Sequence, residues 1–205
     1  MGLVPFLGWL IQRGRCPHCK APVSWQYPFF ELINGLWVCL VFAQGQFNES
    51  TLFVLAISQL LWVLALLDFF SLEIALTPLL IALLLRGVEL TFFAPQQFLD
   101  AVIGLLAGAG VLHWVRSLYY FLRHREGLGE GDATLLGFIG FWLGWQAILP
   151  VLFIASLLGI LYAIILILFR LATFRQEFAF GPWLILASFV FWAFQPLLQQ
   201  AGLSY

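Results

Sequence analysis

The sequence predicts an all-α polytopic integral membrane protein with about seven transmembrane helices. Of the 205 residues, 63% are hydrophobic and only 9% are charged, whereas a soluble domain carries roughly 25% charged residues. Such a chain cannot cover itself with a polar surface, so we expect it to lie in a lipid bilayer. The apolar runs are continuous rather than alternating, which favours helices over the strands of a closed barrel.

Seven apolar runs are candidates for spans, and several are close to the minimum length that crosses the hydrocarbon core. The runs are Pro28–Ala43, Thr51–Phe70, Ile74–Phe93, Phe98–Leu122, Asp132–Leu149, Val151–Phe169 and Pro182–Phe194. We expect the fifth and sixth to be joined by a tight turn near Ala147–Pro150. Residues 28–205 are therefore predicted to form one transmembrane domain, preceded by a short cytoplasmic segment at residues 1–27.

The distribution of basic residues predicts the orientation. They precede the first run and follow the fourth and sixth: Arg13, Arg15, Lys20, Arg123, Arg125, Arg170 and Arg175. Because Lys and Arg are retained on the cytoplasmic side, the N-terminus is predicted in the cytoplasm and the C-terminus outside. The loops after the second and fourth runs then both face the cytoplasm. Arg86 and Arg116 lie within predicted spans, and we expect both to extend towards an interface.

Two aspartates stand at the ends of apolar runs on this cytoplasmic side. Asp68 lies at the end of the second run, and Asp132 begins the fifth, after the glycine-rich segment 126–131. Placing a carboxylate at a membrane boundary costs free energy, so its presence there suggests a functional role. Two neighbouring carboxyl groups can share one proton, so that one acts as base while the other acts as acid. The third aspartate, Asp100, is predicted on the opposite side.

Simpler interpretations of these acidic residues remain open. Asp132 could be the N-cap of the fifth helix, because an acid there accepts hydrogen bonds from free N–H groups. Asp68 could be an ordinary interfacial residue. Three glutamates are expected to be solvated loop charges: Glu73, Glu126 and Glu130.

Several segments carry a resemblance to a known family when they are taken in order. They are residues 5–10 (PFLGWL), 13–19 (RGRCPHC), 24–32 (SWQYPFFEL), Leu67-Asp68, 127–137 (GLGEGDATLLG) and 140–144 (GFWLG). Together they resemble the bacterial type IV prepilin peptidases (prepilin leader peptidase/N-methyltransferases), which are GxGD aspartic peptidases. The resemblance covers most of the chain.

The resemblance implies an aspartic endopeptidase of the bacterial inner membrane. It implies Asp68 and Asp132 as the catalytic pair, with Gly129 and Gly131 shaping the loop that brings Asp132 to Asp68. Members of the family remove the leader of prepilins and pseudopilins at the cytoplasmic face, in type IV pilus biogenesis and type II secretion. Peptide cleavage needs no cofactor, and many members then methylate the new N-terminus with S-adenosylmethionine.

The chain departs from the family's usual pattern in three places. The family usually begins with a further helix and a first Cys-x-x-Cys pair, which precede the segment matched here. Ile74 is followed by Ala75 where the family usually has proline, and Thr134 stands where lysine is common. A catalytically degenerate member of the family is therefore an alternative hypothesis.

The cysteines suggest two further possibilities. Cys16 and Cys19 supply two of the four ligands of a closed zinc site, and the family's other pair comes from the earlier segment. The same Cys-x-x-Cys resembles the active site of a thiol oxidoreductase, but its predicted cytoplasmic place is reducing. Cys39, within the first run, is expected to be an inert buried residue.

A transporter or a structural membrane subunit is the remaining alternative. His113, Arg116 and Glu89 lie within predicted spans, and polar residues there can line a transport path. This alternative leaves the paired aspartates without a role. A net charge of −1 argues against a nucleic-acid partner.

Overall fold

The structure is a computed structural model, and it describes residues 7–16, 19–44, 48–71, 75–124, 129–169 and 179–200. These residues form helices α1 (Leu7–Ile11), α2 (Gln26–Gln44), α3 (Glu49–Ser71), α4 (Leu76–Phe92), α5 (Phe98–Arg123), α6 (Glu130–Leu143), α7 (Ile148–Leu168) and α8 (Gly181–Gln200), with 3-10 turns η1 (Pro95–Gln97) and η2 (Trp145–Ala147). The predicted all-α fold is confirmed. Within the described ranges, the only strand-like pairing is an isolated antiparallel bridge between Arg15 and Pro22.

The chain divides into two compact units, Met1–Thr51 and Leu52–Tyr205. The first unit contains α1 and α2, and α2 begins close to the predicted start of the first span. The predicted division into residues 1–27 and 28–205 stays a prediction. Cys39 is exposed on α2, so the expectation that it is buried is wrong.

Four of the described helical segments are long and apolar enough to cross a membrane. They are Gln26–Gln44, Glu49–Ser71, Pro95–Leu122 and Trp145–Leu168. Many large apolar side chains on these helices are exposed, such as Leu106, Phe153 and Ile160, which is the arrangement expected of helices that face lipid. The molecule is thus a multi-pass membrane protein, while the total of seven spans stays a prediction for the shorter helices α4, α6 and α8.

Helix α6 is the most deeply buried helix of the second unit. All of its residues from Leu135 to Trp142 are buried, and it packs against α4, α5 and α8. Its closest neighbour is α5, where the backbones of the two helices touch. A Cβ atom at Gly104 would overlap the backbone of Gly140, and one at Gly108 would lie 2.9 Å from the carbonyl carbon of Leu136. Glycines therefore permit the close approach of α5 to α6.

The turn after α6 differs from the prediction. The chain leaves α6 at Gly144, whose φ of +87° favours glycine, and then forms η2. Helix α7 already begins at Ile148, so Pro150 lies in its first turn rather than in the connecting turn. Proline is tolerated there because the first N–H groups of a helix have no partner within the helix. The predicted end of the fifth span at Leu149 is therefore wrong.

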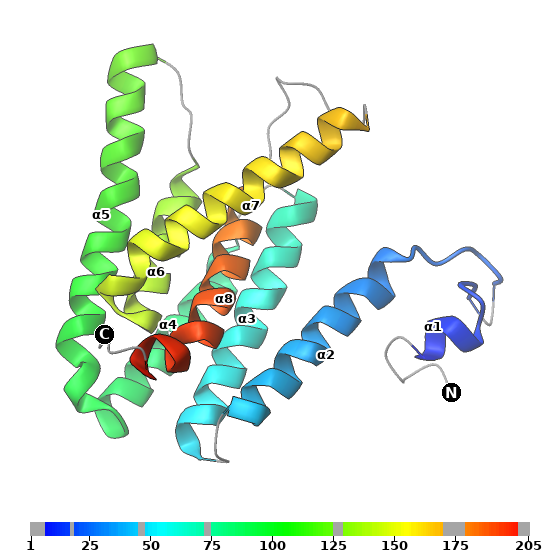
Figure 1. Cartoon of the computed structure of the whole chain (residues 1–205), viewed down its shortest axis with the longest axis horizontal. Helices are drawn as coiled ribbons and strands as arrows, with labels where there is room; N and C mark the ends of the chain where they lie inside the picture. Colours follow the sequence, from blue (N-terminus) through cyan, green and yellow to red (C-terminus); the bar gives the residue numbers. More distant parts are fainter. Residues whose placement is uncertain are drawn as a thin grey trace. The chain divides into compact units, whose positions relative to one another are not determined.

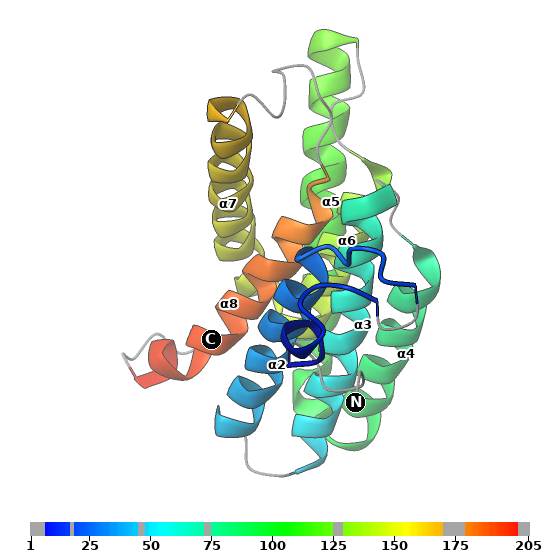
Figure 2. The same cartoon turned by 90° about the vertical axis from the view of Figure 1, so that its right-hand side faces the viewer.

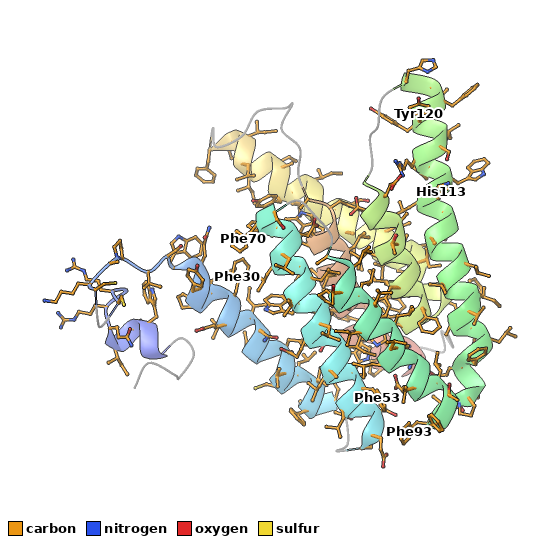
Figure 3. The ribbon with its side chains drawn as sticks, turned by 180° about the vertical axis from the view of Figure 1, so that it is seen from behind. Phe30, Phe53, Phe70, Phe93, His113 and Tyr120 are labelled. Carbon is orange, nitrogen blue, oxygen red and sulfur yellow. The ribbon has the colours of Figure 1, made fainter. Side chains whose placement is uncertain are left out.

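The second unit has two distinguishable ends. The C-terminal ends of α3, α5 and α7 lie towards the same end of this unit, uppermost in both views (Figure 1 and Figure 2). At the other end, Phe53 of α3 and Phe93 after α4 pack with ring centroids 5.5 Å apart, far from Phe70 (Figure 3). The segments that follow α3 and α5 thus begin at the same end, as the prediction from basic residues requires.

A buried ion pair near the end of α4 corrects one expectation. Arg86 donates to Glu89 at 2.7 Å and to the side-chain oxygen of Gln97 at 2.9 Å. Both charged residues are buried, so Arg86 does not extend to an interface as expected. Neutralisation by a partner makes a buried charge tolerable here.

Candidate active site

Asp68 lies in the last turn of α3 and is only 5% exposed. Its carboxylate faces the backbone N–H of Gly181, the first residue of α8. The approach is so close that a Cβ atom at Gly181 would overlap Oδ2 of Asp68. Asp68 is thus a packed residue between two helices rather than an ordinary interfacial one.

Asp132 lies in the first turn of α6 and is 9% exposed. It is the third helical residue, so the interpretation of Asp132 as the N-cap is wrong; the N-cap is Gly129. The Asp132 carboxylate accepts a hydrogen bond from the N–H of Gly129, as the acidic member of a capping box does. A Cβ atom at Gly129 would lie 3.3 Å from Oδ2 of Asp132. Gly131 belongs to the helix rather than to the loop.

The two aspartates are close enough to influence one another. Burial, and after it the negative charge of Asp68, raises the pKa of the Asp132 carboxyl from 3.8 to about 6. Asp132 stands at the start of a 14-residue helix that is not one of the four spanning segments. Ionisation of one carboxyl group therefore disfavours ionisation of the other.

Neither carboxylate has a positively charged partner within the described part of the chain. Glu89, another buried acid, is paired with Arg86, whereas the ion pairs found in this region include neither Asp68 nor Asp132. Buried acids that lie close together without a neutralising cation are typical of acid–base sites rather than of structural ion pairs.

Residues 55–164, more than half of the chain, match the type IV leader peptidase family. The chain belongs to this family. Residues 1–45 match the bacterial peptidase A24 N-terminal domain. The match to the leader peptidase family includes both Asp68 and Asp132, and the resemblance noted in the sequence is confirmed.

Relatives from several bacteria are similar over most of the chain. The prepilin leader peptidase/N-methyltransferase of Aeromonas hydrophila is 39% identical over 193 residues, which cover 91% of this chain and 64% of that protein. The proteins of the same name from Dickeya chrysanthemi and Neisseria gonorrhoeae are 35% and 32% identical, over 88% and 91% of this chain and 64% of each relative. No solved structure is significantly similar. This member of the leader peptidase family thus spans less than two thirds of the length of these relatives.

An ion pair connects the start of α6 to α5 in this family member. Arg116 of α5 donates to Glu130 at 2.7 Å. The hydrogen bond from Arg116, together with its charge, lowers the pKa of the Glu130 carboxyl. Glu130 is exposed, as expected of a solvated charge, but it lies in the first turn of α6 rather than in a loop. Exposed ion pairs contribute little to folding stability. We therefore expect the Arg116–Glu130 pair to affect the orientation of the first turn of α6 more than the stability of the fold.

The other predicted polar site does not form. Glu89 is paired with Arg86, Arg116 is paired with Glu130, and His113 is exposed on α5. Glu89, Arg116 and His113 therefore do not line a common polar cavity, which removes the structural argument for a transport path. Glu73, Glu126 and the loop glycine Gly127 lie outside the described residues.

Backbone hydrogen bonds join Cys16 to the two residues that follow Cys19. The backbone carbonyl of Cys16 accepts a hydrogen bond from the N–H of Lys20, and the N–H of Cys16 donates to the carbonyl of Ala21. Cys16 and Cys19 are thiols rather than a disulfide. No cluster of three or more potential metal ligands occurs among the residues that the structure describes. Two thiols alone do not fit a closed tetrahedral zinc site, which needs four ligands.

The sequence interpretation misses Gly181, which the structure brings against Asp68. One sequence signal for the start of α8 is available: the Gly181-Pro182 pair precedes an apolar run, and proline is favoured at the start of a helix. That signal predicts the beginning of α8 but not its neighbour.

The raised pKa of Asp132 predicts that the folded protein is destabilised when this group ionises. The folded state binds the Asp132 proton more tightly than the unfolded chain does. The contribution of this group to the free energy of unfolding is therefore fully present below about pH 4 and is lost as the pH rises to about 6. We expect Asp132→Asn to increase the free energy of unfolding by up to about 3 kcal/mol near pH 7, with little gain near pH 4. Asparagine retains a side-chain oxygen that can accept the hydrogen bond from the Gly129 N–H.

The melting temperature in detergent, compared with that of the wild type at the two pH values, measures this effect. Asp100→Asn makes the same chemical change at an exposed position and is the control. An equal effect of Asp132→Asn at both pH values would show that the Asp132 charge is not disfavoured by the fold.

Proposed function

We propose that this chain is a membrane aspartic endopeptidase that removes the leader peptide of type IV prepilins or pseudopilins at the cytoplasmic face of the bacterial inner membrane. The observation that carries the proposal is the pair of buried aspartates, Asp68 and Asp132, which influence one another and have no cationic partner among the described residues. Membership of the type IV leader peptidase family and the names of the relatives support it. In the proposed orientation, the N-terminus is cytoplasmic and the C-terminus extracytoplasmic.

The chemistry follows from two carboxyl groups that share one proton. The ionised carboxylate takes a proton from a water molecule, and the water oxygen attacks the carbon of the scissile carbonyl. The protonated carboxyl group donates its proton to the carbonyl oxygen, so that a neutral tetrahedral diol forms. Collapse of the diol then breaks the C–N bond, with a proton delivered to the leaving amine. That proton is the one the first carboxylate took from water, and a diol hydroxyl returns a proton to the second carboxylate, so the pair ends the cycle with the one proton that it held at the start.

Burial of both carboxyl groups suits this reaction. A site with little water strengthens the interaction between the carboxyl groups and the charge that develops on the substrate. A raised pKa of Asp132, to about 6, places its proton exchange close to neutral pH, where acid–base catalysis is efficient. The mechanism uses no metal ion, so it requires no ligand from Cys16 or Cys19. If these two cysteines bind zinc, we propose that the remaining ligands come from outside the described residues.

A second reaction is proposed because the relatives are named as N-methyltransferases as well as leader peptidases. S-adenosylmethionine would supply a methyl group to an amine: the bond from its sulfonium sulfur to the methyl group breaks, a neutral thioether leaves, and the amine loses a proton as the new C–N bond forms. The new N-terminus exposed by leader removal is the acceptor in this proposal. The described residues do not define a site for S-adenosylmethionine, and no step of peptide cleavage depends on it.

Incubation of the purified chain in detergent with a purified prepilin tests the proposal. Mass spectrometry is expected to show the free leader and the shortened pilin, and the pilin gains the mass of a methyl group if S-adenosylmethionine is added and the second reaction occurs. The double variant Asp68→Asn/Asp132→Asn controls for contaminating proteases. Absence of cleavage, in an assay where the Aeromonas hydrophila relative cuts the same prepilin, would instead support a degenerate member of the family.

A further inference from the structure

Gly181, the first residue of α8, lies where the two aspartate-bearing helices meet α8. Its backbone N–H faces the carboxylate of Asp68 at the end of α3. On the other side, a Cβ atom at Gly181 would lie 3.4 Å from Cδ2 of Leu135, which is one helical turn beyond Asp132 on α6. Gly181 is buried, so this position belongs to the surroundings of both aspartates.

Space, rather than backbone conformation, requires glycine at this position. The φ angle of Gly181 is outside the left-handed region, so alanine is compatible with the local backbone. A methyl group, however, would overlap Oδ2 of Asp68, whereas its contact with Leu135 would be an ordinary one. A substitution therefore acts mainly on the carboxylate of Asp68.

The N–H group of Gly181 is suited to orient a carboxylate. The first N–H groups of a helix have no carbonyl partner within the helix, and the helix dipole adds a partial positive charge at this end. Asp68 Oδ2, the oxygen beside Gly181, is buried and has no hydrogen-bond donor among the described residues. The Gly181 N–H that faces this carboxylate is therefore the group placed to set its direction.

We infer that Gly181 is a positioning residue for Asp68: its N–H orients the carboxylate, and its lack of a side chain leaves room for that carboxylate beside α6. Helix α8 is then part of the site. The catalytic consequence rests on the proposed peptidase function, whereas the contact itself does not. The two parts are therefore tested by separate measurements.

The contact is tested by thermal unfolding of four proteins in detergent: the wild type, Gly181→Ala, Asp68→Ala and the double variant. We expect Gly181→Ala to lower the melting temperature by several degrees when Asp68 is present, because the methyl group displaces the carboxylate. In the Asp68→Ala background, the carboxylate is absent and most of that decrease disappears.

Two outcomes of this cycle are decisive. If Gly181→Ala does not fold but the double variant does, the inference is supported in its strongest form. If Gly181→Ala has the same effect in both backgrounds, or if both variants fail to fold, Gly181 does not act through Asp68 and the inference is overturned. This conclusion holds whether or not the wild type cuts a prepilin.

The catalytic part is tested by kinetics of prepilin cleavage. We expect Gly181→Ala to reduce kcat by about 10²-fold with little change in KM, because a small displacement of a catalytic group slows the chemical step more than substrate binding. Gly110→Ala is the matched control, since a Cβ atom at Gly110 on α5 would have no neighbouring atom within 4 Å. Wild-type kcat in folded Gly181→Ala would overturn the positioning role, whereas a wild type that does not cleave would count against the proposed function instead.

Discussion

Asp68→Asn and Asp132→Asn are each expected to reduce the rate of leader removal by at least about 10³-fold, which is within the range that acid–base catalysis contributes. Asparagine has nearly the same shape as aspartate but cannot act as an acid or a base at neutral pH. Each variant therefore removes one half of the proton-sharing pair while the packing of α3 or α6 is retained. The initial rate of prepilin cleavage, measured by mass spectrometry of the released leader, gives the result.

The double variant distinguishes a cooperating pair from two independent contributions. If Asp68 and Asp132 act on the same water molecule, loss of either one disables the mechanism, and Asp68→Asn/Asp132→Asn is no slower than the slower single variant. Independent roles would instead give multiplied effects. Asp100→Asn is expected to cleave at the wild-type rate because Asp100 is exposed at the start of α5. Leader removal by either single variant at the wild-type rate would overturn the assignment.

The sequence predicts the fold class and the approximate helices because both depend on local composition. Phe98–Leu122 is nearly the observed α5, and Thr51–Phe70 lies within the observed α3. The turn predicted near Ala147–Pro150 is misplaced, because α7 already begins at Ile148 and includes Pro150. Proline is acceptable in the first turn of a helix, and the residue that requires a special backbone conformation is Gly144.

Contacts between distant segments are harder to predict. The positions of basic residues predict that Asp68 and Asp132 lie on one side of the membrane, but nothing in the sequence spacing predicts that Gly181 contacts Asp68. The sequence interpretation also misses the partner of Arg86, although Glu89 lies one helical turn away. Residues three or four positions apart on a helix are neighbours, so this pair is a local contact that the spacing could have revealed.

Gly108→Leu is expected to prevent folding and, with it, leader removal. A Cβ atom at Gly108 would lie 2.9 Å from the carbonyl carbon of Leu136 and 3.1 Å from the Cα atom of Gly137. These are backbone atoms of α6, which cannot turn aside as a flexible side chain can. The helices would have to separate, and the buried face of α6 would lose its contacts with α5. Yield of monodisperse protein by size-exclusion chromatography and the melting temperature are the measurements.

Gly110→Leu is the matched control, because Gly110 is exposed on the same helix and has open space around it. It is expected to fold and to cleave as the wild type does. Gly108→Ala gives a graded test: a methyl group forces a smaller separation, so some folded protein is expected, with a lower melting temperature and reduced kcat. The reduction in kcat follows because α6 carries Asp132, which moves with α6 when that helix separates from α5. A monodisperse Gly108→Leu protein with the melting temperature of the wild type would show that α5 and α6 do not approach this closely, and the position of Asp132 would need another explanation.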